Sequence, residues 1–182
     1  MDRKYALFGF LTPLTAFVFI ATTVYIHDFQ FTGNALSDMG QVGGEKNYIF
    51  NMGLILTGIF GFVFALFLYS KVKKYEKGAG LAFMASTLFL ICIGLFPEGT
   101  DPHYAFSVGF YLLASISIFL FGIIILKRKR KIGVFSIVGI AVGLVTALIP
   151  EWKGVAIPET IGAVVICLWV LVISSALWRN EL

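Results

Sequence analysis

The chain has 182 residues, of which 59% are hydrophobic and 13% charged, and its formal net charge is +4. A soluble domain carries about 25% charged residues, so this composition excludes a water-soluble globular protein and indicates an integral membrane protein. The basic excess does not require a nucleic acid, because basic segments beside membrane helices bind anionic lipid.

Six segments contain no Asp, Glu, Lys, Arg or His, and each approaches or exceeds the about 17 to 25 residues that a membrane-crossing helix needs. In chain order they cover residues 5–26, 48–70, 79–96, 104–126, 132–149 and 160–178. They are continuously apolar, whereas barrel strands alternate apolar and polar residues. We therefore predict an all-α polytopic membrane protein, with six transmembrane helices in three antiparallel hairpins that form a single integral membrane domain over residues 1–182.

The first run, residues 5–26, follows Arg3 and Lys4. It is longer than the apolar core of a secretory signal, and no A-x-A-like cleavage site closes it. We predict that it is a permanent span.

The longest connection covers residues 27–47 and is predicted to lie outside the membrane. Long connections in compact proteins are usually functional or disordered. At its centre, NALSDMG predicts a short interfacial helix or turn, in which Asn34 and Ser37 are capping residue types. Leu36 and Met39 are expected to dip into the membrane.

A second polar connection, FPEGTDPHY at residues 96–104, separates the third and fourth runs. Pro97 is expected to end one helix and Gly99 to turn the chain, while Asp101 could cap the next helix. This structural interpretation leaves Glu98 and His103 unexplained. They are therefore candidate site residues.

The last two hairpins repeat when one is shifted by 53 residues onto the other. The shift aligns four pairs: Gly80 with Gly133, Pro97 with Pro150, Glu98 with Glu151, and Gly109 with Gly162. Because both hairpins start on the same side, the pattern suggests a parallel internal repeat. In the fifth run, Gly139 and Gly143 form a GxxxG pattern that predicts close helix packing.

Charge distribution predicts the orientation. Twelve of the fourteen basic residues fall on one side of the predicted spans: Arg3, Lys4, Lys71, Lys73, Lys74, Lys77, Lys127, Arg128, Lys129, Arg130, Lys131 and Arg179. Seven of the ten acids fall on the other: Asp28, Asp38, Glu45, Glu98, Asp101, Glu151 and Glu159. Basic loops stay in the cytoplasm. We therefore expect a protein of the cytoplasmic (plasma) membrane with both termini inside.

No ionisable Asp, Glu, Lys, Arg or His falls within the predicted spans, which argues against a proton relay or a charge-lined pore. Cys92 and Cys167 lie in spans and form no metal-binding pattern. The chemistry is instead expected at the outer surface, where a polar cavity would be rimmed by a set of ligand-binding candidates: Asp38, Asn51, Glu98, Asp101, His103 and Glu151.

Three kinds of chemistry remain open for these residues. A zinc site would draw on His27 and His103 with Asp38 or Glu98, and a calcium site on carboxylates with backbone carbonyls. No divalent metal or other cofactor is firmly implied. A hydrolase would take its catalytic residues from Ser37, Asp38, Glu98 and His103, although the chain lacks GxSxG and HExxH motifs.

The motifs SDMG, a span-head Asn51 and GLFPEGTDPH resemble the signatures of an uncharacterised prokaryotic membrane family, domain of unknown function 998. The resemblance implies a six-span architecture and an outward-facing polar cluster, without a reaction. It carries over these signature positions: Ser37, Asp38, Gly40, Asn51, Phe96, Pro97, Glu98 and His103. The family usually has Glu where this chain has Asp38, a departure that shortens the side chain by one methylene.

Our principal hypothesis is a membrane protein whose outward-facing acidic cavity binds a lipid, an amphiphile or a cation. The alternatives are a membrane-embedded lipid-modifying hydrolase or transferase that uses the same Asp/Glu/His cluster, and a scaffold subunit of a membrane complex. The expected partners are membrane lipids, with either a second copy of the chain or another membrane protein, and no nucleic acid.

Overall fold

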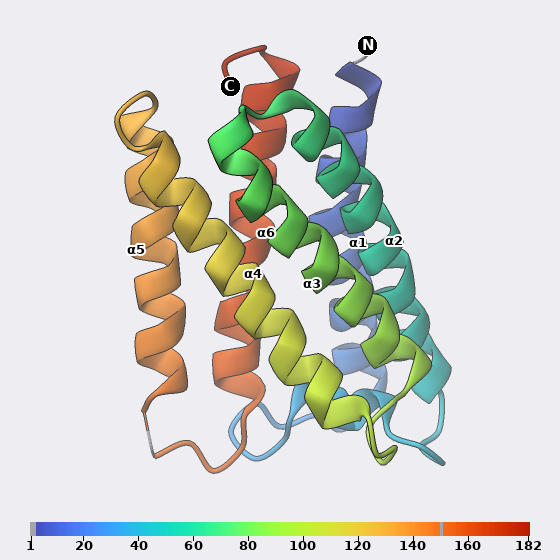
Figure 1. Ribbon diagram of the computed structural model, residues 1–182. Helices are drawn as coiled ribbons and strands as arrows, with labels where there is room; N and C mark the ends of the chain where they lie inside the picture. The colour runs from blue at the N-terminus through green and yellow to red at the C-terminus, as the bar shows by residue number, and fades with distance from the viewer. Residues whose placement is uncertain (1–2, 150) are drawn as a thin grey trace.

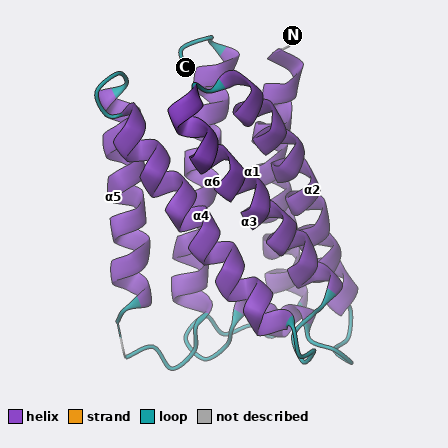
Figure 2. Cartoon of the chain, viewed as in Figure 1, coloured by secondary structure: helices purple, strands orange, loops and turns teal. Residues whose placement is uncertain are grey.

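The computed structural model describes residues 3–149 and 151–182, which are helical with no strand. Six helices follow the predicted apolar runs, and each is long and apolar enough to cross a membrane (Figures 1 and 2). They are α1 (Ala6–Ile26), α2 (Asn47–Lys71), α3 (Lys77–Leu95), α4 (His103–Ile125), α5 (Arg130–Ala147) and α6 (Ala156–Trp178). Three short 3-10 helices accompany them: η1 (Arg3–Tyr5), η2 (Leu36–Gly40) and η3 (Lys74–Glu76). The predicted all-α membrane fold is confirmed.

Consecutive helices pack side by side, and α6 returns to pack against α1. The two ends of the chain lie at the same end of the bundle as the α2–α3 and α4–α5 connections (Figure 1). We call this the basic end, because connections 71–77 and 127–131 supply most of the Lys and Arg. The opposite end, the acidic end, carries connections 27–46, 96–102 and 148–155.

The core is built around Trp169 of α6, which is 1% exposed. Its ring packs against Phe83 of α3, with centroids 5.1 Å apart, and against Phe121 of α4 at 5.5 Å. The indole Nε1 donates a hydrogen bond to Ser136 Oγ of α5 at 3.1 Å. One aromatic residue thus joins four helices toward the basic half of the bundle.

Close helix approaches occur at several glycines, among them Gly139 of the predicted GxxxG pair, where a Cβ would lie 3.2 Å from Val165 of α6. A Cβ on Gly133 of α5 would lie 2.7 Å from Leu126 Cα, and one on Gly58 of α2 would lie 3.0 Å from the Thr87 carbonyl oxygen of α3. By contrast, a Cβ on Gly143 would meet nothing within 4 Å. The packing role predicted for Gly143 is therefore wrong, because α5 has moved away from its neighbours at that level.

The 53-residue repeat stays a prediction. Its Pro150 lies outside the described residues, and the remaining acid pair occupies unequal surroundings. Glu98 contacts the ring of His103, whereas Glu151 is exposed.

Connection 27–46 folds back over the acidic end as a lid. The predicted short helix is present as η2. Leu36 and Met39 are buried within the protein against Phe50 of α2 and Ala156 of α6, rather than dipping into the membrane as predicted. The Ala156 amide donates to the Asn34 carbonyl oxygen at 2.9 Å. The lid is therefore packed and hydrogen-bonded rather than loose.

The glycine contacts generate a test of the packing. Gly58→Ala is expected to lower the free energy of unfolding by about 1–3 kcal/mol, since the new methyl group overpacks the α2–α3 contact. Gly143→Ala is expected to be neutral or stabilising by up to about 1 kcal/mol, because alanine favours a helix and the site is open. Thermal unfolding in detergent measures both changes, and equal effects of the two substitutions would contradict the assigned contacts.

Candidate functional site

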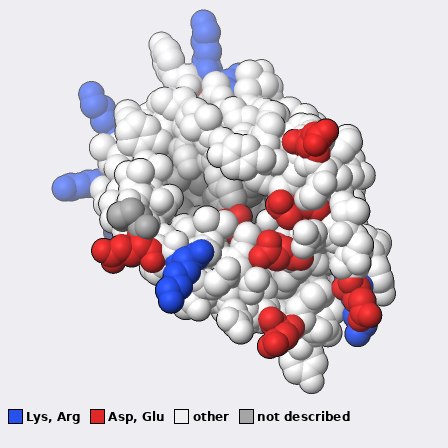
Figure 3. Space-filling view, turned by 90° about the horizontal axis from the view of Figure 1, so that it is seen from below, with Lys and Arg blue, Asp and Glu red and all other residues white. Residues whose placement is uncertain are grey.

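A groove of about 690 Å³ opens between α4, α5 and α6 at the acidic end and is roofed by the lid. Its rim carries Asp38, Glu98, His103 and Glu159. Its inner walls are apolar and include Val108, Leu112, Ile140, Leu144 and Val165. Figure 3 looks onto the acidic end and shows acidic side chains around a hollow in the surface. The groove is thus amphipathic, with charge at the rim and hydrocarbon below it.

The groove exists because α5 diverges from the bundle. Near the basic end α5 packs closely through Gly133, and at mid-height Gly139 lies near Val165. One turn further, Gly143 has open space in front of it and lines the groove together with Ala147. Small residues on this face of α5 leave the wedge between α4, α5 and α6 unfilled.

His103, the first residue of α4, is 5% exposed and anchors the α3–α4 turn. Its Nδ1 lies 2.9 Å from the Phe96 carbonyl oxygen, which can only accept, so this nitrogen carries a proton. Its Nε2 lies 2.9 Å from Glu98 Oε2 and 3.3 Å from Ser107 Oγ. The ring of this candidate residue is therefore buried.

This arrangement differs from that of a nucleophile, base and acid relay. In such a relay the nucleophile and the acid occupy opposite nitrogens of the imidazole ring. Here Glu98 and Ser107 both face Nε2, while a backbone carbonyl occupies Nδ1. The geometry positions the turn and the Glu98 carboxylate at the groove rim.

Asp38 and Asn51 shape the lid. The Asp38 carboxylate accepts hydrogen bonds from the Ala35 amide at 2.9 Å and from Asn34 Nδ2 at 3.1 Å, at the start of η2. Asn51 of α2 donates to the Gly40 carbonyl oxygen at 2.9 Å. Asp38 also faces the groove, whereas Asn51 lines neither the groove nor the cavity described below.

Glu159 is the rim residue that the candidate set left out. The charge-free run was predicted to begin at residue 160, but α6 begins at Ala156, so Glu159 lies in its first helical turn. Its Oε2 accepts a hydrogen bond from the Leu36 amide at 2.7 Å and thereby fixes the lid to α6. The sequence PET at residues 158–160 held a signal, since proline and an acid are both favoured in a first helical turn.

The structure does not bring the other candidates into this site. His27 uses both ring nitrogens on backbone carbonyl oxygens, those of Thr23 at 2.9 Å and Glu45 at 3.1 Å. Asp101 and Glu151 are exposed and line neither the groove nor the inner cavity described below. Asp101 also makes no capping hydrogen bond at the start of α4. Among residues 3–149 and 151–182, no three His, Cys, Asp or Glu side chains are grouped to hold a metal ion. The predicted pairing of His27 with His103 in a metal site therefore finds no support in this geometry.

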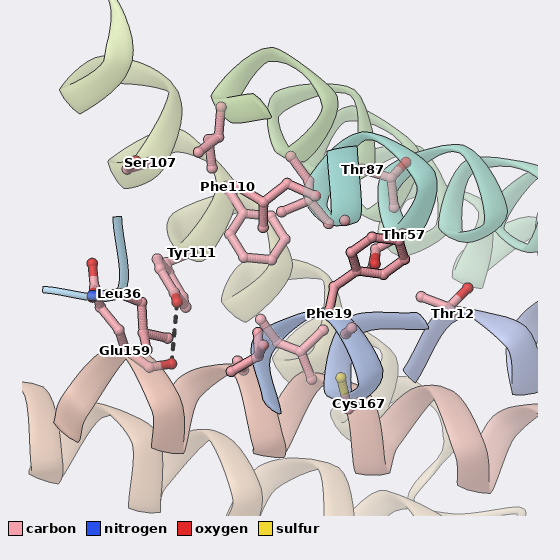
Figure 4. A pocket seen from close by; sticks show the side chains of 18 of the residues that line it. Thr12, Phe19, Leu36, Thr57, Thr87, Ser107, Phe110, Tyr111, Glu159 and Cys167 are labelled. Carbon is pink, nitrogen blue, oxygen red and sulfur yellow. Dashed lines mark hydrogen bonds between the residues drawn. The ribbon is translucent and has the colours of Figure 1, made fainter. Parts of the chain in front are cut away.

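Below the lid lies a second space, an inner cavity of about 100 Å³ within the bundle. Toward the acidic end it shares Ser37, Ser107, Tyr111 and Glu159 with the groove. Tyr111 donates its hydroxyl to the Glu159 backbone carbonyl oxygen at 3.1 Å, as Figure 4 shows. These side chains separate the groove from the inner cavity.

The comparison with protein families agrees with this picture. A model of the family described as "Protein of unknown function (DUF998)" matches residues 10–176. The chain belongs to this family. The match includes the lid, Asn51, and the turn with Glu98 and His103, on which the resemblance was recognised. No curated protein and no solved structure matches the chain.

The anchoring role of His103 is testable. His103→Ala is expected to lower the free energy of unfolding by about 2–4 kcal/mol, because it empties a buried site and leaves the Phe96 carbonyl without its donor. Asp101→Ala, at an exposed position in the same turn, is expected to stay within about 0.5 kcal/mol of wild type. Thermal unfolding compares the two, and a His103→Ala protein as stable as wild type would contradict the anchoring role.

Proposed function

We propose that this DUF998 protein binds an amphiphile in the groove between α4, α5 and α6. The head group would lie at Asp38, Glu98 and Glu159, and the apolar chain would lie along the walls formed by α4 and α5. The observation that carries the proposal is the change of character within one space, from carboxylates at the rim to aliphatic side chains below. Its volume of about 690 Å³ lies within the range of about 300–1,000 Å³ that is usual for ligand pockets.

The rim chemistry favours a head group that is positively charged or donates hydrogen bonds. The carboxyl oxygens of Asp38, Glu98 and Glu159 can accept hydrogen bonds, whereas His103 is the only basic side chain that lines the described groove. Bonds that join a carboxylate to an ammonium are charge-assisted and stronger than neutral ones. An ammonium-bearing lipid therefore complements the rim better than an anionic lipid does.

We further propose that the acidic end faces the outside of the plasma membrane and the basic end the cytoplasm. The support is the strong bias of Lys and Arg toward connections 71–77 and 127–131 together with the chain termini. Short basic loops remain cytoplasmic during insertion. The groove would then open to the outer leaflet.

Binding is tested by filling the groove. Gly143→Phe places a ring in the open space in front of α5, and Val145→Phe adds the same ring on the same helix at a position that is 64% exposed and lines neither space. In lipid nanodiscs, lysophosphatidylethanolamine is expected to bind wild type and Val145→Phe at least about tenfold more tightly than Gly143→Phe, since steric exclusion removes the site. Native mass spectrometry measures the bound fraction.

Head-group preference supplies a second arm of this experiment. Lysophosphatidylglycerol, which lacks an ammonium group, is expected to bind wild type more weakly than lysophosphatidylethanolamine. The preference should shrink in the double variant Glu98→Gln/Glu159→Gln and persist in the exposed control Glu151→Gln. Equal binding of both lipids to all variants, or an unchanged Gly143→Phe, would overturn the groove assignment and direct attention to protein partners.

The orientation is tested separately by labelling intact cells. In a background with Cys92→Ala and Cys167→Ala, Lys153→Cys at the acidic end is expected to react with a membrane-impermeant maleimide. Lys127→Cys, exposed at the basic end, is expected to react only after the cells are permeabilised. The reverse pattern would place the groove in the inner leaflet.

A further inference from the structure

The inner cavity differs from the groove in its walls and in its depth. It lies among α1, α2, α3, α4 and α6, and it extends from Glu159 near the acidic end to Val170 of α6 and Thr12 of α1, well inside the bundle. Its deep walls are apolar and include Phe83, Leu90 and Val170. α5 contributes no residue to it. Its walls therefore come from five helices, whereas the groove lies between three.

Three threonines from different helices line this cavity: Thr12 of α1, Thr57 of α2 and Thr87 of α3. Gly61, one turn after Thr57, would place a Cβ 3.0 Å from Thr87 Cγ2 and 3.5 Å from Thr12 Cγ2. The three side chains are thus near one level of the bundle. Figure 4 shows them on one side of the pocket, with Leu36, Tyr111 and Glu159 on the other.

The hydroxyl of Thr57 is the exception among these residues. Thr12 donates to the Phe8 carbonyl oxygen at 2.8 Å, and Thr87 to that of Met84 at 2.8 Å, as helical threonines usually do. Thr57 is 5% exposed, and its Oγ1 is the only buried side-chain nitrogen or oxygen in the described part of the chain that lacks a hydrogen-bond partner. A buried polar atom without a partner calls for an explanation. The cavity that it lines provides one.

The chemistry of the walls defines the missing partner. A charged group is disfavoured, because no Asp, Lys, Arg or His side chain lines the cavity, its one Glu, Glu159, lies toward the acidic end, and burying an unpaired charge is costly. A single water could donate to the hydroxyl oxygens of Thr12 and Thr87, whose own protons go to the backbone, but it would leave most of an apolar space of about 100 Å³ unfilled. Since the Thr57 hydroxyl has a proton to donate, the best complement is a single oxygen acceptor on an otherwise apolar molecule.

We propose that the inner cavity is a second ligand site, which takes a compact, neutral, apolar molecule with one carbonyl or ether oxygen that accepts a hydrogen bond from Thr57. The size of the cavity narrows the class of ligand further. An apolar protein cavity of about 150 Å³ can hold benzene, so a space of about 100 Å³ suits a group somewhat smaller than a six-membered ring. The ligand enters from the acidic end, past the side chains of Tyr111 and Glu159.

The test uses two probes of the same shape. Cyclopentanone carries a carbonyl oxygen, and methylenecyclopentane replaces that oxygen with a CH₂ group. Each is titrated into the protein in lipid nanodiscs, and the apparent dissociation constant is taken from the rise of Tm with probe concentration, since a ligand that binds the folded state stabilises it. The partitioning of each probe into the nanodisc lipid is the same whichever variant is present. Comparing the variants with one probe therefore isolates the contribution of the protein.

Thr57→Val and Thr87→Val form a matched pair. Each exchanges a hydroxyl for a methyl group in the same cavity, but only Thr57 has a hydroxyl free to bind a ligand. Cyclopentanone is expected to bind wild type and Thr87→Val, and to bind Thr57→Val about 2- to 10-fold more weakly, the usual net effect of one neutral hydrogen bond. Methylenecyclopentane should not distinguish Thr57→Val from wild type. Thr57→Val alone should unfold at or above the wild-type Tm, because it removes an unpartnered hydroxyl.

Two further outcomes separate this site from the groove. Gly143→Phe, which fills the groove, should leave cyclopentanone binding unchanged, because Gly143 does not line the inner cavity. Loss of cyclopentanone binding in Gly143→Phe would place the probe in the groove and overturn the inner site. Equal binding of cyclopentanone to wild type and Thr57→Val, or no Tm shift with any protein, would overturn it as well. Neither result would affect the amphiphile proposal, which is tested with lysolipids.

Discussion

Every backbone amide and carbonyl that lies in hydrocarbon must find its hydrogen-bond partner within its own helix, because lipid offers none. This constraint governs the whole molecule. It converts six apolar runs into six helices and moves irregular backbone to the two ends of the bundle. At the acidic end the irregular backbone is long, and its groups are paired individually: the Leu36 amide with Glu159, the Gly40 carbonyl with Asn51, and the Phe96 carbonyl with His103. The polar side chains that look functional in the sequence are thus also the ones that satisfy the lid and the turn.

That dual use explains why the groove has a charged rim. Glu98, Asp38 and Glu159 each bond at least one ordered group of the protein, which fixes the carboxylate in place and leaves further lone pairs of its oxygens available. Side chains held in this way are pre-organised, so a ligand need not bear the entropy of ordering them. His103 contributes from beneath, by holding the turn that carries Glu98. For the amphiphile binding proposed above, the same few hydrogen bonds would serve both the fold and the ligand.

The apolar part of the site has a different origin, in helix packing. Within lipid, helices associate through close van der Waals contact rather than through a hydrophobic driving force. α5 makes such contact near the basic end through Gly133 and through Ser136, which accepts the Trp169 indole bond. It then separates from α4 and α6 toward Gly143, and the groove is the resulting wedge. The inner cavity arises from a comparable lack of filling, where Thr57 and its neighbours leave a space among five helices.

The sequence by itself determined the number and class of the six long helices. The length of an apolar run and the absence of charge within it are local properties, and they suffice to make the run a membrane-crossing helix. It also determined the short helix at residues 36–40, and the family, through the motifs around Asp38, Asn51 and His103. Only the tertiary structure decided which polar residues meet. It placed Glu159 on the rim and His27 away from it, buried His103, left Gly143 without a neighbour, and isolated the Thr57 hydroxyl. Each of these depends on the relative height and rotation of helices far apart in the chain, and those are set by side-chain packing between helices rather than by the pattern within one of them.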